Sequence, residues 1–484
     1  MTRVSRRSGE NGPGCGARLV ILYICDSLRR DRLSCYGYGR RTTPHVDELA
    51  EDGVVFERAF SEATWTRPAA ASLLTSLYPL AHGLVWVSHA LSRCVPTLPA
   101  ILRREGFRTV AISANGNVST SFGFDNGFDA FGDLYRDPEV VRRRGSNRDR
   151  WMFRLVGETA EIGDPRSEDV NDRLFEMLDR TQYDRPLFLF LWSNDTHDPY
   201  DPPAGDRLFL PESASPGMRA DQKEIKAATT PEELGRISDL YDCEIHSNDR
   251  TIGQLVSWTK EHGLYESSLI VLASDHGEAF GEHGETGHGG MPYDERIAIP
   301  LIIKFPHQRW AGLRFSAFVQ LTDVAPTVLE CLGIEVPRHW QGQSLIAALR
   351  GEALPRDSVY SHYHMTADRP EMTCIRTQRY KLVEFPRRPG NGGRGFRLRA
   401  RLWEGIGGSA PARLLLDVQA DPPEAFNISS LGSLKHRLAM ASRLRGWRDR
   451  CRALRSRLGL RKSLNVGIAE QLQLRRHLQH LGYI

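Results

Sequence analysis

Short, fully apolar segments alternate with helical patterns along most of this chain. The apolar segments have the length of single strands and cover 19–25, 109–113, 187–192, 269–274 and 299–305. The helical patterns cover 44–52, 68–77, 95–105, 167–181, 234–262 and 323–332. A strand without a polar face must be covered on both sides, which is typical of a parallel sheet between two layers of helices. The sequence therefore predicts an α/β fold with three layers, α/β/α, around a large and mostly parallel sheet.

The pattern divides the chain into three parts. Residues 1–17 are rich in Arg, Ser and Gly and are expected to form a disordered basic tail. Residues 18–370 carry the alternating pattern and are predicted to form the main, catalytic domain. Residues 371–484 begin with strand candidates at 374–383 and 413–418 and end in basic helices. They predict a small C-terminal α+β subdomain.

Polar side chains follow several of the predicted strands directly. Asp26 follows the first strand, Asn115 follows the second, and Asn194 and His197 follow the third. Asp275 and His276 follow the fourth strand. Ligands of open α/β sheets bind beyond the carboxyl ends of the strands. The sequence therefore predicts that these side chains meet in one site.

The segment 64–75 reads Thr-Trp-Thr-Arg-Pro-Ala-Ala-Ala-Ser-Leu-Leu-Thr. Proline is favoured in the first turn of a helix, so Pro68 places Thr66 at a helix N-terminus. Unpaired N–H groups and the helix dipole attract an anion there, and the Thr66 alcohol could attack a phosphate or sulfate ester. The alternative is that Thr66 is a simple N-cap.

Asp26, Asp275 and His276 have the side chains of a divalent metal site, with the Thr66 hydroxyl as a fourth ligand. Such an ion polarises a phosphoryl or sulfuryl oxygen and lowers the pKa of a coordinated alcohol. Two histidines could serve a leaving group, His197 after its strand and His288 in the Gly-rich stretch 281–290. By contrast, His283 is interpreted as a residue of a surface loop.

Ten segments, in order, resemble the motifs of one known family. They are 22–31, 42–50, 71–79, 82–83, 123–129, 274–278, 293–302, 323–327, 379–382 and 481–483. The first resembles the opening strand and D-x-L-R-x-D of the sulfatase family, in the alkaline phosphatase-like superfamily. The third resembles its A-S-L-L-T-G-x-Y-P signature. The resemblance implies an alkaline phosphatase-like fold, a metal-dependent ester hydrolase, and a small-molecule, glycan or lipid ester as substrate.

The resemblance also implies roles for single residues. Asp26, Thr66, Asp275 and His276 match the metal site, and Thr66 is also the nucleophile. His197 and His288 match positions that contact the substrate or leaving group. Substrate contacts are expected from Arg67, Asn115 and Asn194, with Asn117 competing with Asn115 for its role.

Two departures from the family pattern bear on mechanism. Sulfatases carry a Cys or Ser in C/S-x-P-x-R that is oxidised to formylglycine. Here Thr66 stands in its place and Ala70 in place of the Arg, so no formylglycine is expected. The variant resembles phosphotransfer branches such as lipoteichoic-acid synthases and phosphoethanolamine transferases. Ser27 replaces a second Asp and His276 an Asn, which favours one Mn²⁺ or Zn²⁺ over Ca²⁺.

Three functions remain open at this level. The first is a hydrolase of a sulfate or phosphate ester that uses Thr66. The second is a soluble phospho- or sulfotransferase in which an alcohol takes the group from Thr66. The third is a silent family member that only binds an anion, which the loss of the Arg at Ala70 favours.

Charge and cysteine content bear on partners and location. Residues 431–484 carry thirteen Lys and Arg against two acidic residues, while the whole chain has a net charge of +4. No nucleic-acid module is recognisable, so nucleic acid is not an expected partner. The eight cysteines are scattered, and no segment has the length of a transmembrane helix. The chain is therefore expected to be cytoplasmic.

The polar stretches 134–166 and 204–233 are interpreted as lids. The sequence pattern predicts neither the identity of the substrate nor the oligomeric state.

Overall fold

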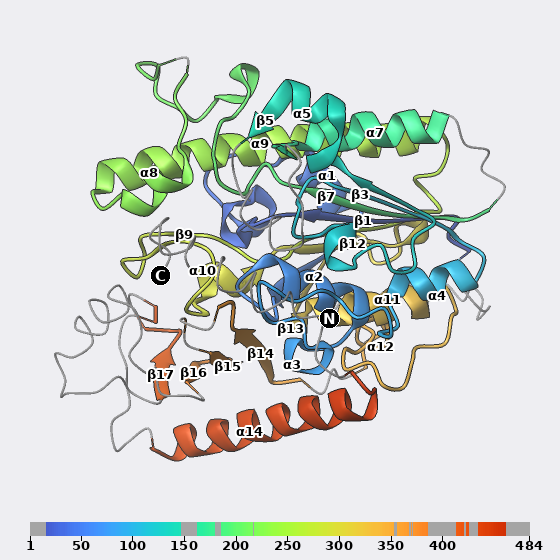
Figure 1. Cartoon of the computed structure of the whole chain (residues 1–484), viewed down its shortest axis with the longest axis vertical. Helices are drawn as coiled ribbons and strands as arrows, with labels where there is room; N and C mark the ends of the chain where they lie inside the picture. Colours follow the sequence, from blue (N-terminus) through green and yellow to red (C-terminus); the bar gives the residue numbers. More distant parts are fainter. Residues whose placement is uncertain are drawn as a thin grey trace, which may run out of the picture.

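A nine-stranded sheet forms the centre of the molecule (Figure 1). The computed structural model describes residues 16–146, 162–179, 185–215, 217–352, 356–366, 369, 371–385, 413–420, 423–424 and 434–460. The strands of the sheet are β1 (Leu19–Cys25), β2 (Val54–Phe60), β3 (Arg108–Ser113), β4 (Ala130–Asp133), β7 (Leu187–Ser193), β8 (Leu269–Ser274), β11 (Ala298–Ile299), β12 (Leu301–Lys304) and β13 (Leu313–Gln320). Their order is β11-β2-β12-β8-β1-β7-β3-β4, and β13 pairs with β2.

The sheet is mostly parallel, as predicted. Strands β8, β1, β7, β3 and β4 run parallel to one another, and β12 runs antiparallel to both β8 and β2. The predicted strand at 299–305 is divided into β11 and β12. Strands β2 and β13 were not predicted, because Glu57 and Arg58 interrupt the first, and Arg314 and Ser316 interrupt the second. Such strands lack the continuous apolar run that marks a strand covered on both faces.

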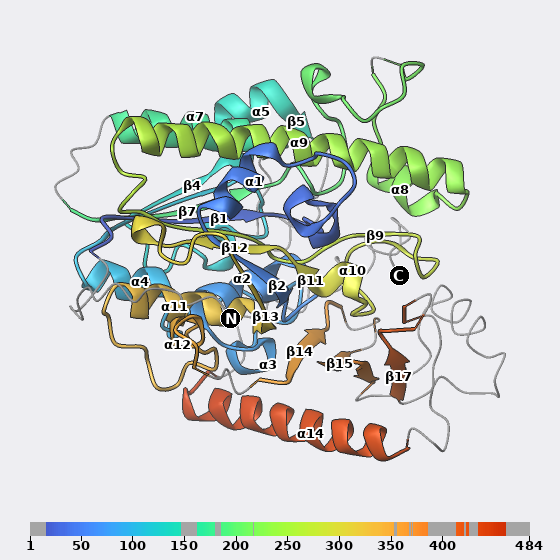
Figure 2. The ribbon, with the colours of Figure 1, turned by 180° about the vertical axis from the view of Figure 1, so that it is seen from behind.

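Helices cover both faces of the sheet (Figures 1 and 2). One face carries α1 (Pro44–Glu51), α7 (Ser167–Asp179) and α9 (Pro231–Glu261). The other carries α2 (Thr66–Thr75), α4 (Leu98–Arg104) and α11 (Val324–Cys331). Alternate side chains of β1 divide between the two cores, Ile21 and Tyr23 on the first face and Leu22 and Ile24 on the second. The predicted three-layer α/β/α fold is therefore confirmed.

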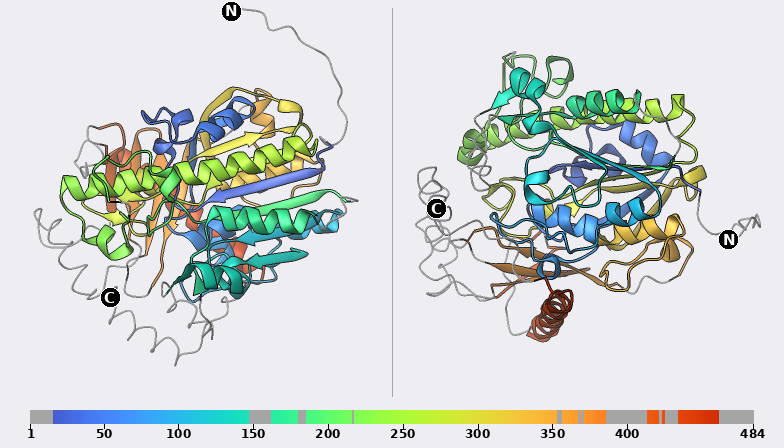
Figure 3. Two further views of the ribbon diagram at one scale, coloured as in Figure 1. Left: turned by 90° about the horizontal axis from the view of Figure 1, so that it is seen from above. Right: turned by 45° about the vertical axis from the view of Figure 1, so that its right-hand side comes forward.

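A second, antiparallel sheet has the order β14-β15-β16-β17. Its strands are β14 (Ser358–Tyr363), β15 (Met372–Thr377), β16 (Tyr380–Glu384) and β17 (Arg413–Asp417). The long helix α14 (Leu434–Arg457) lies beside this sheet, and its Trp447 stacks on Tyr360 at a centroid distance of 5.1 Å (Figures 1 and 3). The predicted boundary at 370/371 falls between β14 and β15. Residues 1–15 of the predicted tail 1–17 and the last motif, 481–483, lie outside the described residues. Ala17 is buried in the core, so the predicted tail extends too far.

The polar stretch 204–233 contains α8 (Gln222–Ala227). Gln222 Nε2 donates to Asp198 Oδ2 at 3.2 Å, which ties this stretch to the loop after β7. Leu234, just beyond it, packs against Gly281 in the loop after β8. The stretch therefore lies beside the two loops that carry the predicted histidines. Within the described residues, no helix is long and apolar enough to cross a membrane.

The remaining short elements connect these layers. They are α3 (Pro79–His82), α5 (Pro138–Arg144), α10 (Asp294–Ile297), α12 (Ile346–Leu349), β5 (Gly145–Ser146), β6 (Ile162–Gly163), β9 (Ala279–Phe280) and β10 (Thr286–Gly287).

Candidate active site

The loops after β1, β3 and β7 bring three predicted site residues into direct contact. Asp26 is completely buried and accepts a hydrogen bond from Asn115 Nδ2 at 2.6 Å. The same Nδ2 donates to Asn194 Oδ1 at 3.1 Å. Asn117 instead accepts from Arg67 Nε at 3.0 Å. The geometry therefore places Asn115, and not Asn117, beside the carboxylate of Asp26.

Trp192 is a partner of Asp26 that the sequence analysis did not identify. Its Nε1–H donates to Asp26 Oδ2 at 2.9 Å. Trp192 lies inside the apolar run of β7, where a tryptophan reads as an ordinary core residue. Its role depends on the neighbouring strand, and the sequence of β7 contains no signal for it.

Thr66 is the first residue of α2, and its side chain faces the loop after β8. Thr66 Oγ1 lies 3.4 Å from His276 Nε2. Trp65 precedes the helix in extended conformation and gives no side-chain cap to the first turn. The N-cap interpretation of Thr66 is therefore wrong, and its hydroxyl is positioned among polar side chains at the positive end of the helix dipole.

Asp26, Asp275 and His276 fit a bound cation. One potential ligand atom from each lies within 4.8 Å of the others, and all three side chains are buried. His276 Nδ1 lies 3.0 Å from the carbonyl oxygen of Gly277, so Nδ1 carries the proton and Nε2 presents a lone pair. His276 Nε2 lies 3.2 Å from Asp275 Oδ2, which has no hydrogen-bond partner among the described residues.

Electrostatics lead to the same interpretation. Burial, with a smaller effect of the neighbouring His288, lowers the pKa of His276 to about 3, so its imidazole is neutral. Burial and the charge of Asp26 raise the pKa of Asp275 well above its usual value. A positive charge between a buried carboxylate and an imidazole lone pair that face each other would stabilise both groups. The donor set therefore matches a divalent metal ion, with Thr66 Oγ1 close enough to join it.

His197 and His288 lie beside this group. The His288 ring lies 4.8 Å from the His276 ring and 4.7 Å from the His197 ring, measured between centroids. Glu278 is completely buried, and its Oε2 lies 3.3 Å from His288 Nδ1. Burial opposes a charge on His288, but the Glu278 carboxylate outweighs it and raises the pKa of His288 to about 9. His288 is thus protonated near neutrality, as a general acid requires.

The other histidine of this loop has a different environment. His283 Nδ1 lies 2.9 Å from Glu295 Oε1, and its ring stacks on Tyr293 at 3.8 Å. These contacts hold His283 against α10 and agree with its interpretation as a residue of a surface loop.

Arg67 follows Thr66 but its guanidinium is held by another loop. Its Cζ lies 3.4 Å from the centre of the Phe122 ring, and its Nη1 donates to the carbonyl oxygen of Val87. Nη2 is buried and has no hydrogen-bond partner among the described residues. Arg67 therefore braces the loop at Val87, and its contact with substrate stays a prediction. Ala70 is buried in the core, so α2 has no charge at that position.

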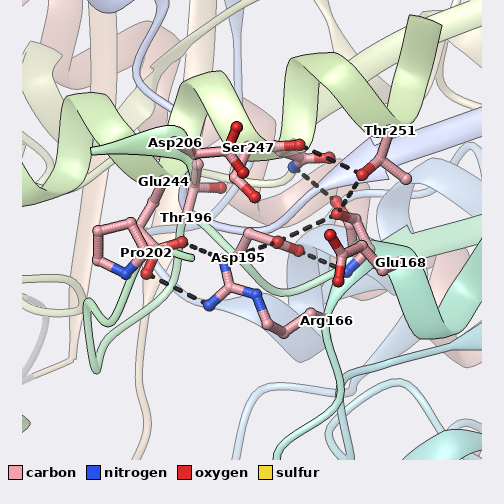
Figure 4. A network of polar contacts seen from close by, with 12 residues as sticks. Arg166, Glu168, Asp195, Thr196, Pro202, Asp206, Glu244, Ser247 and Thr251 are labelled. Carbon is pink, nitrogen blue, oxygen red and sulfur yellow. Dashed lines mark hydrogen bonds and ion pairs between the residues drawn. The ribbon is translucent and has the colours of Figure 1, made fainter. Parts of the chain in front are cut away.

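A buried ionic network holds the loop that carries Asn194 and His197 (Figure 4). Arg166 Nη2 lies 3.1 Å from Asp195 Oδ1 and also contacts Glu244 Oε2. Asp195 Oδ2 accepts from the Ser167 backbone N–H at 2.6 Å. Thr196, the next residue, donates from its hydroxyl to the carbonyl oxygen of Asp26. The network thereby connects the loop after β7 to α7 and α9.

We expect Arg166→Ala to lower the free energy of unfolding by about 3 kcal/mol, since it leaves two buried carboxylates without their cation. Activity should also fall, because the loop with Asn194 and His197 loses its anchor. Chemical denaturation checks the first effect. Arg93→Ala is the control, because it removes an exposed ion pair with Asp125 and should cost less than about 1 kcal/mol. Equal losses in both variants would contradict the assigned role of Arg166.

The sulfatase family model matches residues 18–334, and the model of the C-terminal region of N-sulphoglucosamine sulphohydrolase matches residues 281–391. An N-acetylglucosamine-6-O-sulfatase of Bacteroides thetaiotaomicron is 25% identical, over 76% of this chain and 78% of its own. The multifunctional alkaline phosphatase superfamily protein PehA of Trinickia caryophylli is also 25% identical, over 85% of this chain and 91% of its own. The human N-sulphoglucosamine sulphohydrolase is 25% identical over 77% and 76%.

Solved structures share the fold. BT4656 in complex with its substrate, D-glucosamine-2-N,6-O-disulfate, superimposes with a TM-score of 0.70 at 20% identity, covering 91% of this chain and 98% of that one. The phosphonate monoester hydrolase of Agrobacterium radiobacter gives a TM-score of 0.66 at 22% identity, with coverage of 91% and 96%.

Proposed function

We propose that this chain, which belongs to the sulfatase family, is a metal-dependent hydrolase that cleaves sulfate esters of sugars with the unmodified hydroxyl of Thr66 as nucleophile. The observation that carries the proposal is the convergence of Asp26, Asp275 and His276 on the side of Thr66 Oγ1 at the N-terminus of α2. The sugar follows from relatives named for glucosamine sulfates.

In the proposed mechanism, Thr66 and His288 carry the reaction through two steps. Thr66 Oγ1 releases its proton to bulk water and forms a bond to sulfur as the bond to the ester oxygen breaks, and His288 gives its proton to that leaving oxygen. His288, now neutral, takes a proton from water, whose oxygen attacks sulfur. The bond from sulfur to Thr66 Oγ1 breaks, sulfate leaves, and Oγ1 takes a proton back from bulk water. Asp26, Asp275 and His276 would hold a metal ion, whose Lewis acidity would lower the pKa of an alcohol and offset negative charge on sulfuryl oxygens. The first-turn N–H groups of α2 face the same anion.

A phosphorus ester is the second candidate substrate. The observation that favours it is Thr66 itself, because a threonine ester lacks the elimination route that an aldehyde hydrate provides. The fold likeness to a phosphonate monoester hydrolase is compatible with this chemistry. An acceptor alcohol in place of water would make the same site a transferase, and a site that binds the anion without turnover would make it a silent relative.

We further propose Mn²⁺ or Zn²⁺ as the ion, since an imidazole joins two carboxylates in the donor set. Ca²⁺ remains the alternative. A cytoplasmic location is also proposed; the seven cysteines that the structure describes are all free, which suits a reducing compartment.

One panel of assays tests the proposed function. Protein supplied with Mn²⁺ is given glucosamine-6-sulfate, an aryl sulfate, a phosphate monoester, a phosphate diester and a phosphonate, each with and without an acceptor alcohol. We expect sulfate release from the sugar ester with the highest kcat/KM. A preference for a phosphorus ester supports the second candidate, and product formation only with the alcohol supports the transferase. No turnover and no bound metal would support the silent relative.

We expect His288→Gln to lower kcat about 10²- to 10³-fold on a sugar sulfate, because the leaving alkoxide no longer receives a proton. The loss should be far smaller on an aryl sulfate whose phenol is a good leaving group. His283→Gln is the matched control, since its imidazole lies in the same loop but contacts Tyr293 and Glu295. Steady-state kinetics on both esters check this, and equal losses on the two esters would contradict a role as general acid.

A further inference from the structure

The two oxygens of the Asp275 carboxylate have different surroundings. Asp275 Oδ1 accepts the backbone N–H groups of Ser27 and His276, at 3.0 and 2.9 Å. Asp275 Oδ2 is buried, and among the described residues it has no hydrogen-bond partner. Its neighbour is His276 Nε2, at 3.2 Å. Asp275 therefore has one oxygen occupied by the protein and one oxygen directed toward the imidazole.

The Asp26 carboxylate is divided in the same way. Asp26 Oδ2 accepts from Trp192 Nε1 at 2.9 Å and from Asn115 Nδ2 at 2.6 Å. A carboxylate oxygen has about two lone-pair sites, so these two donors occupy Oδ2. Asp26 Oδ1 accepts from the Ser27 hydroxyl at 3.0 Å and lies 3.9 Å from His276 Nε2. A lone pair thus stays on Oδ1, the oxygen that lies toward the imidazole.

Ser27 contributes to both carboxylates through its backbone conformation. Its φ of 60° lies in the left-handed region, which residues with a side chain rarely adopt. In this conformation its N–H donates to Asp275 and its hydroxyl to Asp26. Such a conformation costs roughly 1 to 3 kcal/mol and persists only where the surroundings enforce it. The turn after β1 therefore orients the two carboxylates relative to each other.

Trp192 holds its oxygen with a donor that has a fixed direction. Its side chain is completely buried, and its ring meets the Phe190 ring edge to face at a centroid distance of 5.9 Å. An indole has one N–H in the plane of its ring, whereas a hydroxyl such as that of Ser27 rotates. Packing of the ring therefore sets the direction from which Asp26 Oδ2 is held.

The second donor to Oδ2 is fixed by a chain of hydrogen bonds. Asn115 Oδ1 accepts the backbone N–H of Asn117 at 2.7 Å, which assigns the other end of the amide as the donor. Asn117 Oδ1 in turn accepts from Arg67 Nε at 3.0 Å. The Asn115 amide is thus oriented by residues that lie outside the group of metal ligands.

A carboxylate that offers one oxygen is selective among metal ions. Ca²⁺ takes about six to eight oxygen ligands and often includes a carboxylate that binds through both oxygens. Mn²⁺ and Zn²⁺ are smaller, accept imidazole readily and need fewer ligands from the protein. A group of two single carboxylate oxygens and one imidazole nitrogen therefore favours the smaller ions.

We propose that Trp192, together with Asn115, is a positioning residue that holds Asp26 Oδ2, so that Asp26 binds the ion through Oδ1 alone and the site prefers Mn²⁺ to Ca²⁺. The proposal rests on the proposed function, because it concerns the ion of that same site. Without the indole N–H, the Asp26 carboxylate can turn and offer both oxygens. Ca²⁺ tolerates this change better than Mn²⁺.

The test measures metal affinity in the full chain, separately from turnover. Metal-free protein is titrated calorimetrically with Mn²⁺ and, in a second experiment, with Ca²⁺. The wild type should bind Mn²⁺ at least about tenfold more tightly. Trp192→Phe should weaken Mn²⁺ binding about 10- to 100-fold, as expected when a residue that orients a metal ligand is lost. Ca²⁺ binding should change much less, so the ratio of the two affinities should fall about tenfold.

Two further variants separate positioning from a loss of packing. Phe188→Leu is the matched control, since it removes a buried aromatic ring from the same strand and no polar group. It should lower the thermal stability and leave both metal affinities unchanged. Asn115→Ala removes the other donor to Oδ2 and should also lower the ratio, which keeps the test decisive if Trp192→Phe does not fold. Thermal unfolding without metal verifies that each variant is folded.

The outcomes distinguish the inference from the proposed function. Folded Trp192→Phe with unchanged affinities, or with both ions weakened equally, overturns the positioning role and leaves the proposed function standing. A wild type that binds neither ion overturns both. If the wild type prefers Mn²⁺, and Trp192→Phe loses this preference, the positioning role is supported. Failure of that same wild type to release sulfate from glucosamine-6-sulfate would then overturn only the proposed function.

Discussion

Thr66→Ala is expected to abolish turnover, with kcat at least about 10⁴-fold below the wild type. The reason is that the variant removes the atom that forms the covalent bond to the transferred group. Thr66→Ser keeps an alcohol at the start of α2 and should retain activity within about 100-fold. Steady-state kinetics on the preferred ester of the panel measure both effects.

Two further measurements make this prediction specific. Peptide mass spectrometry should find Thr66 unmodified in the resting protein and carrying the transferred group when a slow substrate is quenched during turnover. Thr75→Ala is the matched control, because its hydroxyl lies on the same helix but donates to the Ala71 carbonyl oxygen. If Thr66→Ala kept its kcat, or the trapped group lay on another side chain, Thr66 would not be the nucleophile.

Asp275→Asn is expected to remove metal binding together with activity. The wild type should hold one equivalent of divalent metal after dialysis, and the variant close to none, with kcat lowered about 10³-fold or more. Both would follow from the proposed metal site, because Asp275 Oδ2 is a buried carboxylate oxygen without a hydrogen-bond partner among the described residues. Elemental analysis and kinetics with added Mn²⁺ measure these changes.

The same substitution should have opposite effects on stability with and without metal. A ligand at about 100 times its Kd adds about 2.7 kcal/mol to the free energy of unfolding, so a chelator should destabilise the wild type. Without metal, Asp275→Asn should be the more stable protein. Burial and the charge of Asp26 disfavour the ionised carboxylate, as its raised pKa shows, whereas the amide carries no charge. Asp449→Asn, on the exposed side of α14, should respond to the chelator as the wild type does. A chelator-insensitive wild type would contradict the metal site.

The sequence predicted those parts of the site whose residues directly follow buried strands. Asp26 follows β1 and Asp275 follows β8, and both strands are apolar runs in the central sheet. Because β1 and β8 pair in parallel, the topology places both residues at the same edge of the sheet. Trp192 and Glu278 could not be assigned in this way. Trp192 acts on Asp26 from the neighbouring strand, and Glu278 acts on His288 across a turn. Both roles arise from pairing between segments that the local pattern does not encode.

Arg67 shows most clearly that the place of a residue in the sequence does not fix the contacts of its side chain. Arg67 is next to Thr66 in sequence, and its contact with substrate stays a prediction; the structure places its guanidinium against Phe122 and the Val87 carbonyl oxygen. A helix turns by about 100° per residue, so neighbours in the first turn point in different directions. Which direction meets the metal ligands depends on how α2 is set against the sheet.

By itself, the sequence determined the three-layer fold, the edge of the sheet that holds the site and the chemical types of its side chains. Periodicity and strand-end polarity are local properties, and they suffice for these conclusions. Only the tertiary structure decided that His276 Nε2 faces Asp275 Oδ2, and that Arg166 holds the loop after β7 through Asp195 and Glu244. These depend on distances between segments up to several hundred residues apart, and packing of the whole chain sets those distances.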